Sequence, residues 1–504
     1  MTLRLHNTLT GTDQIFESQT PNLVRLYTCG PTVYDYLHVG NWFGYIAWDV
    51  LVRVLIANEY EVERVLNITD VGHLVSDGDE GQDKLEKGAK REGKTAWDIA
   101  DFYSQDFLKG VDRLGLVQPQ HIVKATDYIP QQIELVRTLK NKGYTYQIDD
   151  GIYFDTSKFP SYADFAHLDL KALQAGARVE FNPEKRNHSD FALWKFTPES
   201  EKRDMEWETP DDILEYRSEK IEDSESSNKK NPSGEQPVMG FPGWHLECSA
   251  MAMSILGETL DIHTGGIDHI PVHHTNEIAQ SEAATGKTFS KFWLHNNHLK
   301  VDGTKISKSL DNGYTLDDLA KKGYSPDDFR MFALQTHYRT EGNFTFDNLT
   351  SAKNRLHNWR NIAALRHQTH DTLRDDDDKC TDDKSVSLYA TAQAVLAALN
   401  EDLNTPAALA IVDDAFSRLT HTRLDDIHQH AFVQLLETVD ELLGLRLVAN
   451  SPDVSDDIKM FIIKRQQARE RQDWQTSDDL RKEIEKSGIT VRDTAHGPIW
   501  EYLD

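Results

Sequence analysis

Two cysteines, a histidine and a glutamate stand where they could bind a metal ion. Cys29 ends a strand-like apolar run, and Cys248 closes a short string that contains Trp244. His273 and Glu277 lie four residues apart at an expected helix start, which puts them on one face. Thiolate, imidazole and carboxylate groups are all zinc ligands. Buried cysteines are also ordinary core residues, and the sequence has no Cys-x-x-Cys pair, so spacing alone leaves both interpretations open.

A second group of residues has the order of a phosphate-binding site. After the turn that follows Cys29, the segment from His38 to Asn41 precedes apolar residues at helical spacing. A strand, a turn and a helix N-terminus present backbone N–H groups and a positive dipole end to an anion. Far downstream, Lys305 and Lys308 flank Ser307 in a loop, and paired ammonium groups suit a developing pyrophosphate charge. Each signal is weak by itself, since a lysine-rich loop is usually a solvated turn.

Together, the two phosphate motifs resemble the HIGH and KMSKS signatures of class I aminoacyl-tRNA synthetases. The remaining detail resembles the cysteinyl-tRNA synthetase family. The strings that carry this resemblance follow the family's order over nearly the whole chain: residues 27–35, 67–70, 190–195, 243–251, 273–282 and 403–406.

The resemblance implies one Zn²⁺ per chain, with four ligands: Cys29, Cys248, His273 and Glu277. Four protein ligands fill a tetrahedral shell, so we expect a five-coordinate complex or a displaceable Glu277 when the substrate thiolate binds. Serine has a harder, less acidic hydroxyl and would lose that bond.

The resemblance also implies substrate sites for ATP with Mg²⁺ and for L-cysteine. The expected catalytic residues are His38, Asn41, Lys305 and Lys308. The ATP site would be completed by Gly40, Gly265 and Asp268. Cysteine would contact Gly30, Thr69 and Trp244. This sequence departs from the family at Asn41, which replaces the second histidine of HIGH, and at Thr275, which replaces a common glutamate.

Near the C-terminus a basic segment ends in an aromatic residue. Single-stranded RNA is recognised by stacking of its bases on aromatic rings and by hydrogen bonds to base edges. An exposed basic helix would show the same pattern. The resemblance assigns four residues to the anticodon loop of tRNA(Cys): Arg469, Trp474, Asp478 and Asp493.

Composition limits the class of protein. The 504 residues are 38% hydrophobic and 27% charged, with three cysteines, which fits a reducing compartment. No apolar run approaches the ~18 residues of a membrane span and no signal peptide is evident, so we expect a cytoplasmic enzyme without membrane contact, and a monomer. The net charge of −28 has the wrong sign for a protein that holds a polyanion. Binding of tRNA is therefore expected on local basic stripes.

Alternating strand and helix patterns predict an α/β fold, with a Rossmann-like parallel sheet split by an insertion, a C-terminal helical bundle and a small anticodon-binding domain. Strands are expected at 23–28, 62–68 and 259–263, so that Cys29, Thr69 and His263 would lie at strand ends and line one crevice. Expected helix N-caps are Thr315, Ser325 and Thr405.

We expect six parts. They are the first catalytic half at 1–118, an insertion at 119–239 with a flexible acidic loop at 216–240, the second catalytic half with the zinc site at 240–300, the lysine loop and stem-contact region at 301–347, the helical bundle at 348–450 and the anticodon-binding domain at 451–504. A second acidic run lies at 371–379.

Three functions are compatible with these motifs. The first is charging of tRNA(Cys) with cysteine. The second is a cysteine ligase that transfers the activated acid to a small amine, as a related mycothiol-pathway enzyme does. The third is a non-catalytic RNA-binding paralogue, for which Asn41 is the only hint. The basic C-terminal segment argues against the second, and the retained lysines and metal positions argue against the third.

Overall fold

The computed structural model describes residues 2–71, 84–168, 182–198, 200, 202–215, 237–369, 383–494 and 497–503. Most of the loop expected at 216–240 and the whole acidic run at 371–379 lie outside these residues.

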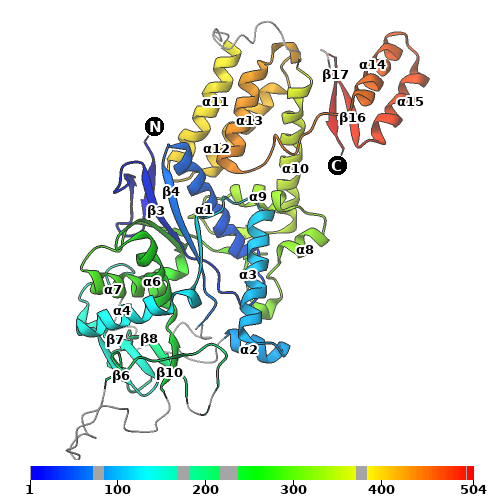
Figure 1. The fold of residues 1–504 in the computed structure, drawn as a ribbon. Coiled ribbons are helices and arrows are strands. Elements are labelled where there is room, and N and C mark those ends of the chain that lie inside the picture. Colours follow the sequence, from blue (N-terminus) through cyan, green and yellow to red (C-terminus); the bar gives the residue numbers. More distant parts are fainter. Residues whose placement is uncertain are drawn as a thin grey trace, which may run out of the picture.

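A five-stranded parallel sheet forms the centre of the N-terminal part (Figure 1). Its strand order is β12 (Ser290–Asn296), β11 (Leu260–Gly266), β3 (Leu23–Thr28), β4 (Glu61–Ile68) and β5 (His121–Lys124). From β3 the chain adds β4 and β5 on one side and later returns to add β11 and β12 on the other. The order therefore reverses between β3 and β11, and ligands of such sheets bind at the carboxyl ends of strands at this point. The predicted fold class is confirmed.

The predicted strands match the observed ones in position but not at every boundary. The strand at 23–28 agrees with β3, and Thr69 directly follows β4. The prediction that His263 ends a strand is wrong, because β11 continues to Gly266 and His263 lies inside it, fully buried. The parallel sheet also includes β5, which lies past residue 118.

The first helix, α1 (Val39–Ala57), follows the turn after β3 and is buried along most of its length. Trp42 of α1 stacks on Phe107 of α3 (Ala96–Arg113), with ring centroids 5.6 Å apart. Gly110 of α3 allows this contact, since a Cβ there would lie 2.3 Å from the Trp42 ring. Among the described helices, α1 has the length and composition to cross a membrane, but 67% of that stretch is buried inside the protein, as in a core helix.

Along the chain, an antiparallel sheet with its own core is inserted between the two halves of the parallel sheet. Its order is β6 (Thr145–Ile148), β7 (Gly151–Phe154), β8 (Phe191–Phe196), β10 (Met239–Pro242) and β9 (Trp207–Glu208). The stacked rings of Phe154 and Phe191 fill the space against α4 (Ile129–Asn141) and α6 (Trp244–Leu256). Helix α6 then leads back to β11.

Beyond β12 the chain forms a small three-stranded sheet and becomes helical. The sheet contains β13 (Leu299–Val301), β14 (Thr304–Lys305) and β15 (Gly342–Phe344). The helices are α8 (Leu316–Lys321), α9 (Pro326–Leu334), α10 (Phe346–Ala363), α11 (Asp383–Asn400), α12 (Thr405–Leu419) and α13 (Gln429–Leu443). Thr315 and Ser325 are N-caps with reciprocal hydrogen bonds, as predicted. The prediction for Thr405 is wrong: the cap is Asn404, whose side chain accepts from the Ala407 amide.

A buried ionic network joins the catalytic part to these helices. Asp49 of α1 forms ion pairs with Arg53 and with Arg330 of α9, and its Oδ1 accepts the Val117 amide at 2.6 Å. The Arg330 Nε also donates to the Leu443 carbonyl at the end of α13, at 2.6 Å. One carboxylate thus fixes α1 against α9 and the end of α13.

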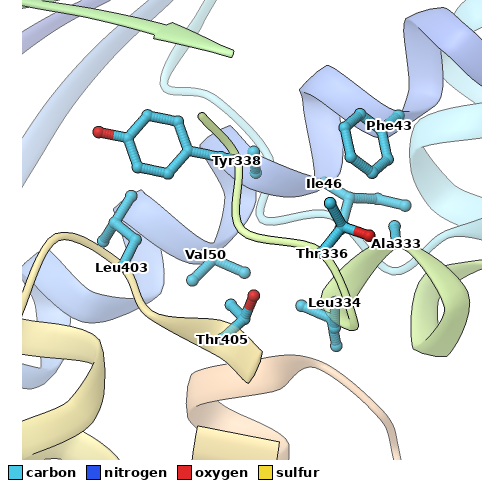
Figure 2. A pocket seen from close by; sticks show the side chains of 10 residues that line it. Phe43, Ile46, Val50, Ala333, Leu334, Thr336, Tyr338, Leu403 and Thr405 are labelled. Atoms are coloured by element: carbon cyan, nitrogen blue, oxygen red, sulfur yellow. The ribbon is translucent and has the colours of Figure 1, made fainter. Parts of the chain in front are cut away.

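A small cavity of about 20 Å³ lies nearby, between α1, the end of α9 and the start of α12 (Figure 2). The side chains of Phe43, Val50, Leu334 and Leu403 point into it, with the Thr336 and Thr405 hydroxyls at its edge. Its size suits about one water molecule. None of the expected site residues lines it.

The last unit consists of α14 (Asp456–Glu470), α15 (Trp474–Glu485), β16 (Ile489–Thr494) and β17 (Gly497–Tyr502). Its core is built from Ile458, Ile462, Ile484, Val491 and Trp500. Gln368 bonds to the backbone of Trp500, and Asn361 accepts the Tyr502 amide, so β17 is tied to the end of α10. In Figure 1 this unit lies at the far end of the molecule from the antiparallel sheet.

Candidate metal centre and catalytic crevice

The structure brings the four predicted metal ligands together. One ligand atom from each of Cys29, Cys248, His273 and Glu277 lies within 4.8 Å of the other three, and all four residues are buried. Cys29 directly follows β3, and Cys248 lies in α6. His273 lies in a single π-helical turn, Ile270–His274, that precedes α7 (Thr275–Thr285), which carries Glu277. The i, i+4 relation was predicted, but the π-helical turn was not.

The geometry of this cluster suits a metal ion. Oε1 of Glu277 is buried and accepts no hydrogen bond from the described residues, although His273 Nε2 lies 2.9 Å away. These two atoms are close enough to be ligands of one ion. The donor set of two sulfurs, one nitrogen and one oxygen fits Zn²⁺.

The electrostatics of the cluster agree with that fit. Burial raises the pKa of the Cys29 thiol, but Cys248 and the neighbouring imidazoles outweigh it and hold that pKa well below its usual value. The hydrogen bond to Cys29, together with burial, raises the pKa of Cys248. Burial opposes the charged form of His273, yet Glu277 and Cys29 raise its pKa to about 10. The raised pKa values of Cys248 and His273 reflect the negative charge of Cys29 and Glu277, which a divalent cation would neutralise.

Further histidines support the ligands, and the sequence argument gave none of them this role. His263 Nε2 lies 2.6 Å from Glu277 Oε2, and His245 Nδ1 lies 3.0 Å from His273 Nδ1. Such partners orient ligand side chains. Cys29, His263 and His274 form an overlapping group that could also hold a cation. Burial lowers the pKa of His274 to about 4, so its ring is neutral at pH 7. The four histidines between residues 263 and 274 were the feature of the sequence that could have predicted these supporting roles.

The three residues expected to contact cysteine lie beside this cluster. The Gly30 amide donates to Asn67 Oδ1 at 2.8 Å, and Asn67 Nδ2 donates to the Thr69 hydroxyl at 3.2 Å. Gly30 has no room for a side chain, since a Cβ there would lie 1.5 Å from the Asn67 carbonyl oxygen. The Trp244 ring stacks on His273, with centroids 4.4 Å apart. Gly30 thus follows the ligand Cys29, Trp244 stacks on the ligand His273, and Thr69 is linked to Gly30 through Asn67.

His38 and Asn41 form the cap of α1. The Gly40 amide donates to His38 Nδ1 at 3.1 Å, and the His38 amide donates to Asn41 Oδ1 at 3.1 Å. Burial lowers the pKa of His38. Because Nδ1 accepts a hydrogen bond, the neutral ring carries its proton on Nε2, which becomes a donor. An amide at position 41 suits the cap, since its oxygen accepts while its nitrogen can still donate outward.

The lysine loop lies against this helix start. Val39 donates to the Tyr314 carbonyl at 2.8 Å, and Ile306 packs so closely on Gly40 that a Cβ there would lie 2.8 Å from it. Lys305 ends β14 and is exposed. Lys308 forms an ion pair with Asp35, and its ammonium lies 5.1 Å from the Tyr34 ring centroid. The lysine loop and the α1 cap, nearly 270 residues apart in sequence, thus form one edge of the crevice.

Gly265 and Asp268 lie where β11 ends. A Cβ at Gly265 would lie 2.6 Å from His274, so the strand can pass the histidines only without a side chain there. Asp268 is exposed in the short turn Ile267–His269, with its Oδ1 close to Gly266.

The residues expected at the anticodon lie on the C-terminal unit. Arg469 forms an ion pair with Asp493 at 3.4 Å, and its guanidinium lies 5.6 Å from the Trp474 ring centroid. Trp474 is 57% exposed, and Asp478 is exposed one turn later on α15. Arg465, which the sequence argument did not single out, holds Asp493 through two bonds of 2.8 and 2.9 Å. The hydrogen bond from Arg465 lowers the pKa of Asp493.

Two family models match this chain. The model described as tRNA synthetases class I (C) catalytic domain matches residues 15–213 and 223–354, and the cysteinyl-tRNA ligase anticodon binding domain matches residues 451–500. A cysteine–tRNA ligase of Treponema denticola is 36% identical over the whole of both chains. Cysteine–tRNA ligase 1 of Burkholderia lata is 39% identical, over 99% of this chain and 96% of its own. The chain belongs to the cysteine–tRNA ligase family. The resemblance to cysteinyl-tRNA synthetases is confirmed.

Solved structures with a similar fold agree with family membership. A Mycobacterium tuberculosis methionyl-tRNA synthetase in complex with methionyl-adenylate matches with a TM-score of 0.53 and 15% identity, over 85% of this chain and 91% of its own. An Agrobacterium radiobacter LeuRS in a ternary complex matches with a TM-score of 0.58 and 12% identity, over 87% and 86%. At these identities the likeness concerns the fold alone.

Proposed function

We propose that this chain activates L-cysteine with ATP to cysteinyl-adenylate and transfers the cysteinyl group to the 3′ end of tRNA(Cys). The observation that carries the proposal is the convergence of Cys29, Cys248, His273 and Glu277 at the end of β3. This thiolate-selective donor set adjoins a helix N-terminus and a lysine loop. Family membership supports the same reaction.

Activation would take place in the crevice between β3 and β11. The ATP phosphates lie at the α1 N-terminus, where His38 Nε2 and Asn41 Nδ2 donate hydrogen bonds. Gly265 and Asp268 bind the nucleoside. The cysteine carboxylate attacks the α-phosphorus, pyrophosphate leaves, and Lys305 and Lys308 stabilise its developing charge. A terminal ribose hydroxyl of the tRNA then attacks the acyl carbon, and AMP leaves.

Cysteine would bind beside the metal site that distinguishes it from serine. Gly30, Thr69 and Trp244 form the walls of its pocket, while Cys29, Cys248, His273 and Glu277 hold Zn²⁺. The bound ion would supply a position that prefers a thiolate to the hydroxyl of serine. Glu277 is fixed on its other oxygen by His263, which keeps the carboxylate in place. Discrimination through a bond that the competitor lacks can be large.

The anticodon of tRNA(Cys) would contact Arg469, Trp474, Asp478 and Asp493, with Mg²⁺ accompanying ATP in the crevice. The six-part division of the chain, a monomeric state and a cytoplasmic location belong to the same proposal.

The decisive experiment is cysteine-dependent charging of tRNA(Cys) by the purified protein, with serine as the control amino acid. We expect charging with cysteine and little with serine. Pyrophosphate exchange without tRNA charging would favour the small-amine ligase, and absence of cysteine-dependent exchange would favour the non-catalytic paralogue.

A further inference from the structure

Two exposed aromatic side chains lie together beside the catalytic crevice. Tyr36 is 45% exposed and Phe102 of α3 is 47% exposed, with ring centroids 6.0 Å apart. Both rings contact Tyr103, which is buried beneath them, at 5.1 Å. The Lys94 ammonium lies 5.4 Å from the centroid of Phe102. We name Tyr36, Phe102 and Lys94 the aromatic patch.

This exposure is unusual in the described part of the chain. Among its exposed large apolar side chains, four are aromatic: Tyr36, Trp97, Phe102 and Trp474. Trp97 is explained by its packing on Trp207 and by its Nε1 bond to the Asp204 carbonyl. Trp474 belongs to the anticodon-binding unit. Tyr36 and Phe102 remain, and they adjoin each other although 66 residues separate them.

The aromatic patch is continuous with the catalytic machinery. Tyr36 stands two residues before His38 and directly follows Asp35, which holds Lys308. Tyr36 therefore lies between Asp35, which holds the lysine loop, and the His38 cap of α1.

Basic residues lie on one side of the patch. Residues 84–94, which form α2 (Lys84–Glu92) and the turn into α3, contain five basic and two acidic residues in a protein of net charge −28. On α3 the neighbours of Phe102 are acidic: Asp98 and Asp106 lie one turn before and after it, while Asp101 bonds to Gln105 and lies 3.5 Å from Lys124. The patch thus combines exposed rings with a local basic stripe, the two features by which proteins bind single-stranded nucleic acid.

We propose that the aromatic patch binds the unpaired 3′ end of the tRNA by stacking its bases on Phe102 and Tyr36, while Lys94 contacts a phosphate. The inference rests on the proposed function for the identity of the RNA. The aromatic patch would then be the surface on which the 3′ end lies between the acceptor stem and the activated cysteine.

The test compares binding of two tRNA(Cys) transcripts, one complete and one without its three unpaired 3′ nucleotides, at fixed salt. Wild-type protein should bind the complete transcript more tightly. In Phe102→Ala the loss of stacking should weaken binding of the complete transcript by about tenfold, with little change for the shortened one. Phe102→Tyr keeps a ring and should behave like wild type. Both variants replace an exposed side chain, and near-ultraviolet circular dichroism checks their fold.

Equal weakening of both transcripts, or of neither, would overturn the inference. A rise in the KM for ATP with unchanged RNA binding would also overturn it, since the ring would then contact the adenine. Lys94→Gln provides a second test. The plot of the logarithm of the tRNA binding constant against the logarithm of the salt concentration has a negative slope, and the magnitude of this slope should decrease by about one for the complete transcript. Wild-type protein that binds tRNA but does not charge it would count against the proposed function instead.

Discussion

Lys308 combines an exposed position with a specific partner. Its ammonium is held by Asp35 and lies over the Tyr34 ring, so the side chain is aimed before any substrate binds. A charge positioned in this way stabilises the transition state more than the ground state.

Lys308→Ala should therefore lower kcat for cysteine-dependent pyrophosphate exchange by about 10²–10³-fold while the dissociation constant of ATP changes little. Lys321→Ala is the matched control, because this exposed lysine of α8 pairs only with Asp318 among the described contacts. A variant whose sole defect is weaker ATP binding would show that Lys308 has been given the wrong role.

Cys248 offers the sharpest test of the metal centre. Cys248→Ser should reduce the zinc content of the purified protein from about one per chain to a small fraction, because a hydroxyl is a poor ligand for this ion. Plasma emission spectrometry measures it, and Cys380→Ser, which removes the third thiol of the sequence, is the control. Undiminished zinc in Cys248→Ser would refute the ligand set.

At this scale the sequence predicted the residues whose chemistry is distinctive. The spacing of cysteine, histidine and glutamate suggested a metal cluster, and the resemblance to cysteinyl-tRNA synthetases gave the four ligands. His263 was expected only to line the crevice, and Arg465 was not singled out. Their roles depend on partners from distant elements, Glu277 and Asp493 respectively.

Helix α1 is the element on which the catalytic part and the helical bundle meet. Its N-terminus is capped by His38 and Asn41, and its middle is fixed by the network of Asp49, Arg53 and Arg330. Burial raises the pKa of Asp49, but the two guanidinium groups outweigh it and hold that pKa below its ordinary value.

Asp49→Asn should lower the free energy of unfolding by about 3–5 kcal/mol, because it leaves buried guanidinium charge uncompensated. Chemical denaturation measures the change, and Asp414→Asn, which breaks the exposed pair with Arg418, should cost less than about 1 kcal/mol. The wild-type contribution is complete above the ordinary aspartate pKa of about 4. It is lost as pH falls further, since the unfolded carboxyl takes up its proton first. A cost for Asp49→Asn no larger than for the control would exclude a structural role for the network.

Elements with strong local signals were predictable, and those that depend on tertiary contacts were not. The apolar spacing after Asn41 predicted α1, and the Thr315 and Ser325 caps predicted two helix starts. The three extra residues of β11 follow from pairing with β12, which local sequence does not encode. The π-helical turn before α7 was not predicted.

Over the whole molecule, the candidate metal centre and the proposed anticodon-binding unit lie far apart. The candidate metal centre lies at the end of β3, between α6 and α7, whereas Trp474 lies on α15 of the distant C-terminal unit (Figure 1). The two functions should therefore be separable by mutation.

Trp474→Ala should weaken tRNA(Cys) charging about tenfold or more through the loss of base stacking, worth roughly 1–3 kcal/mol, and leave cysteine-dependent pyrophosphate exchange nearly intact. Met460→Ala, another exposed side chain of the same unit, serves as control. Equal loss of both activities would mean that the unit supports the catalytic fold.

The position of the metal ligands also affects how the protein is made. Cys29 leaves the ribosome about 220 residues before Cys248, which at 5–20 residues per second is a delay of roughly 10–45 s. During that time β3 lacks β11, its neighbour on one side, so the nascent chain carries an unpaired strand edge next to a thiol that has not yet met its partner. A ribosome that pauses within the insertion would prolong the exposure of this edge, and exposed strand edges are features that make folding intermediates prone to aggregation.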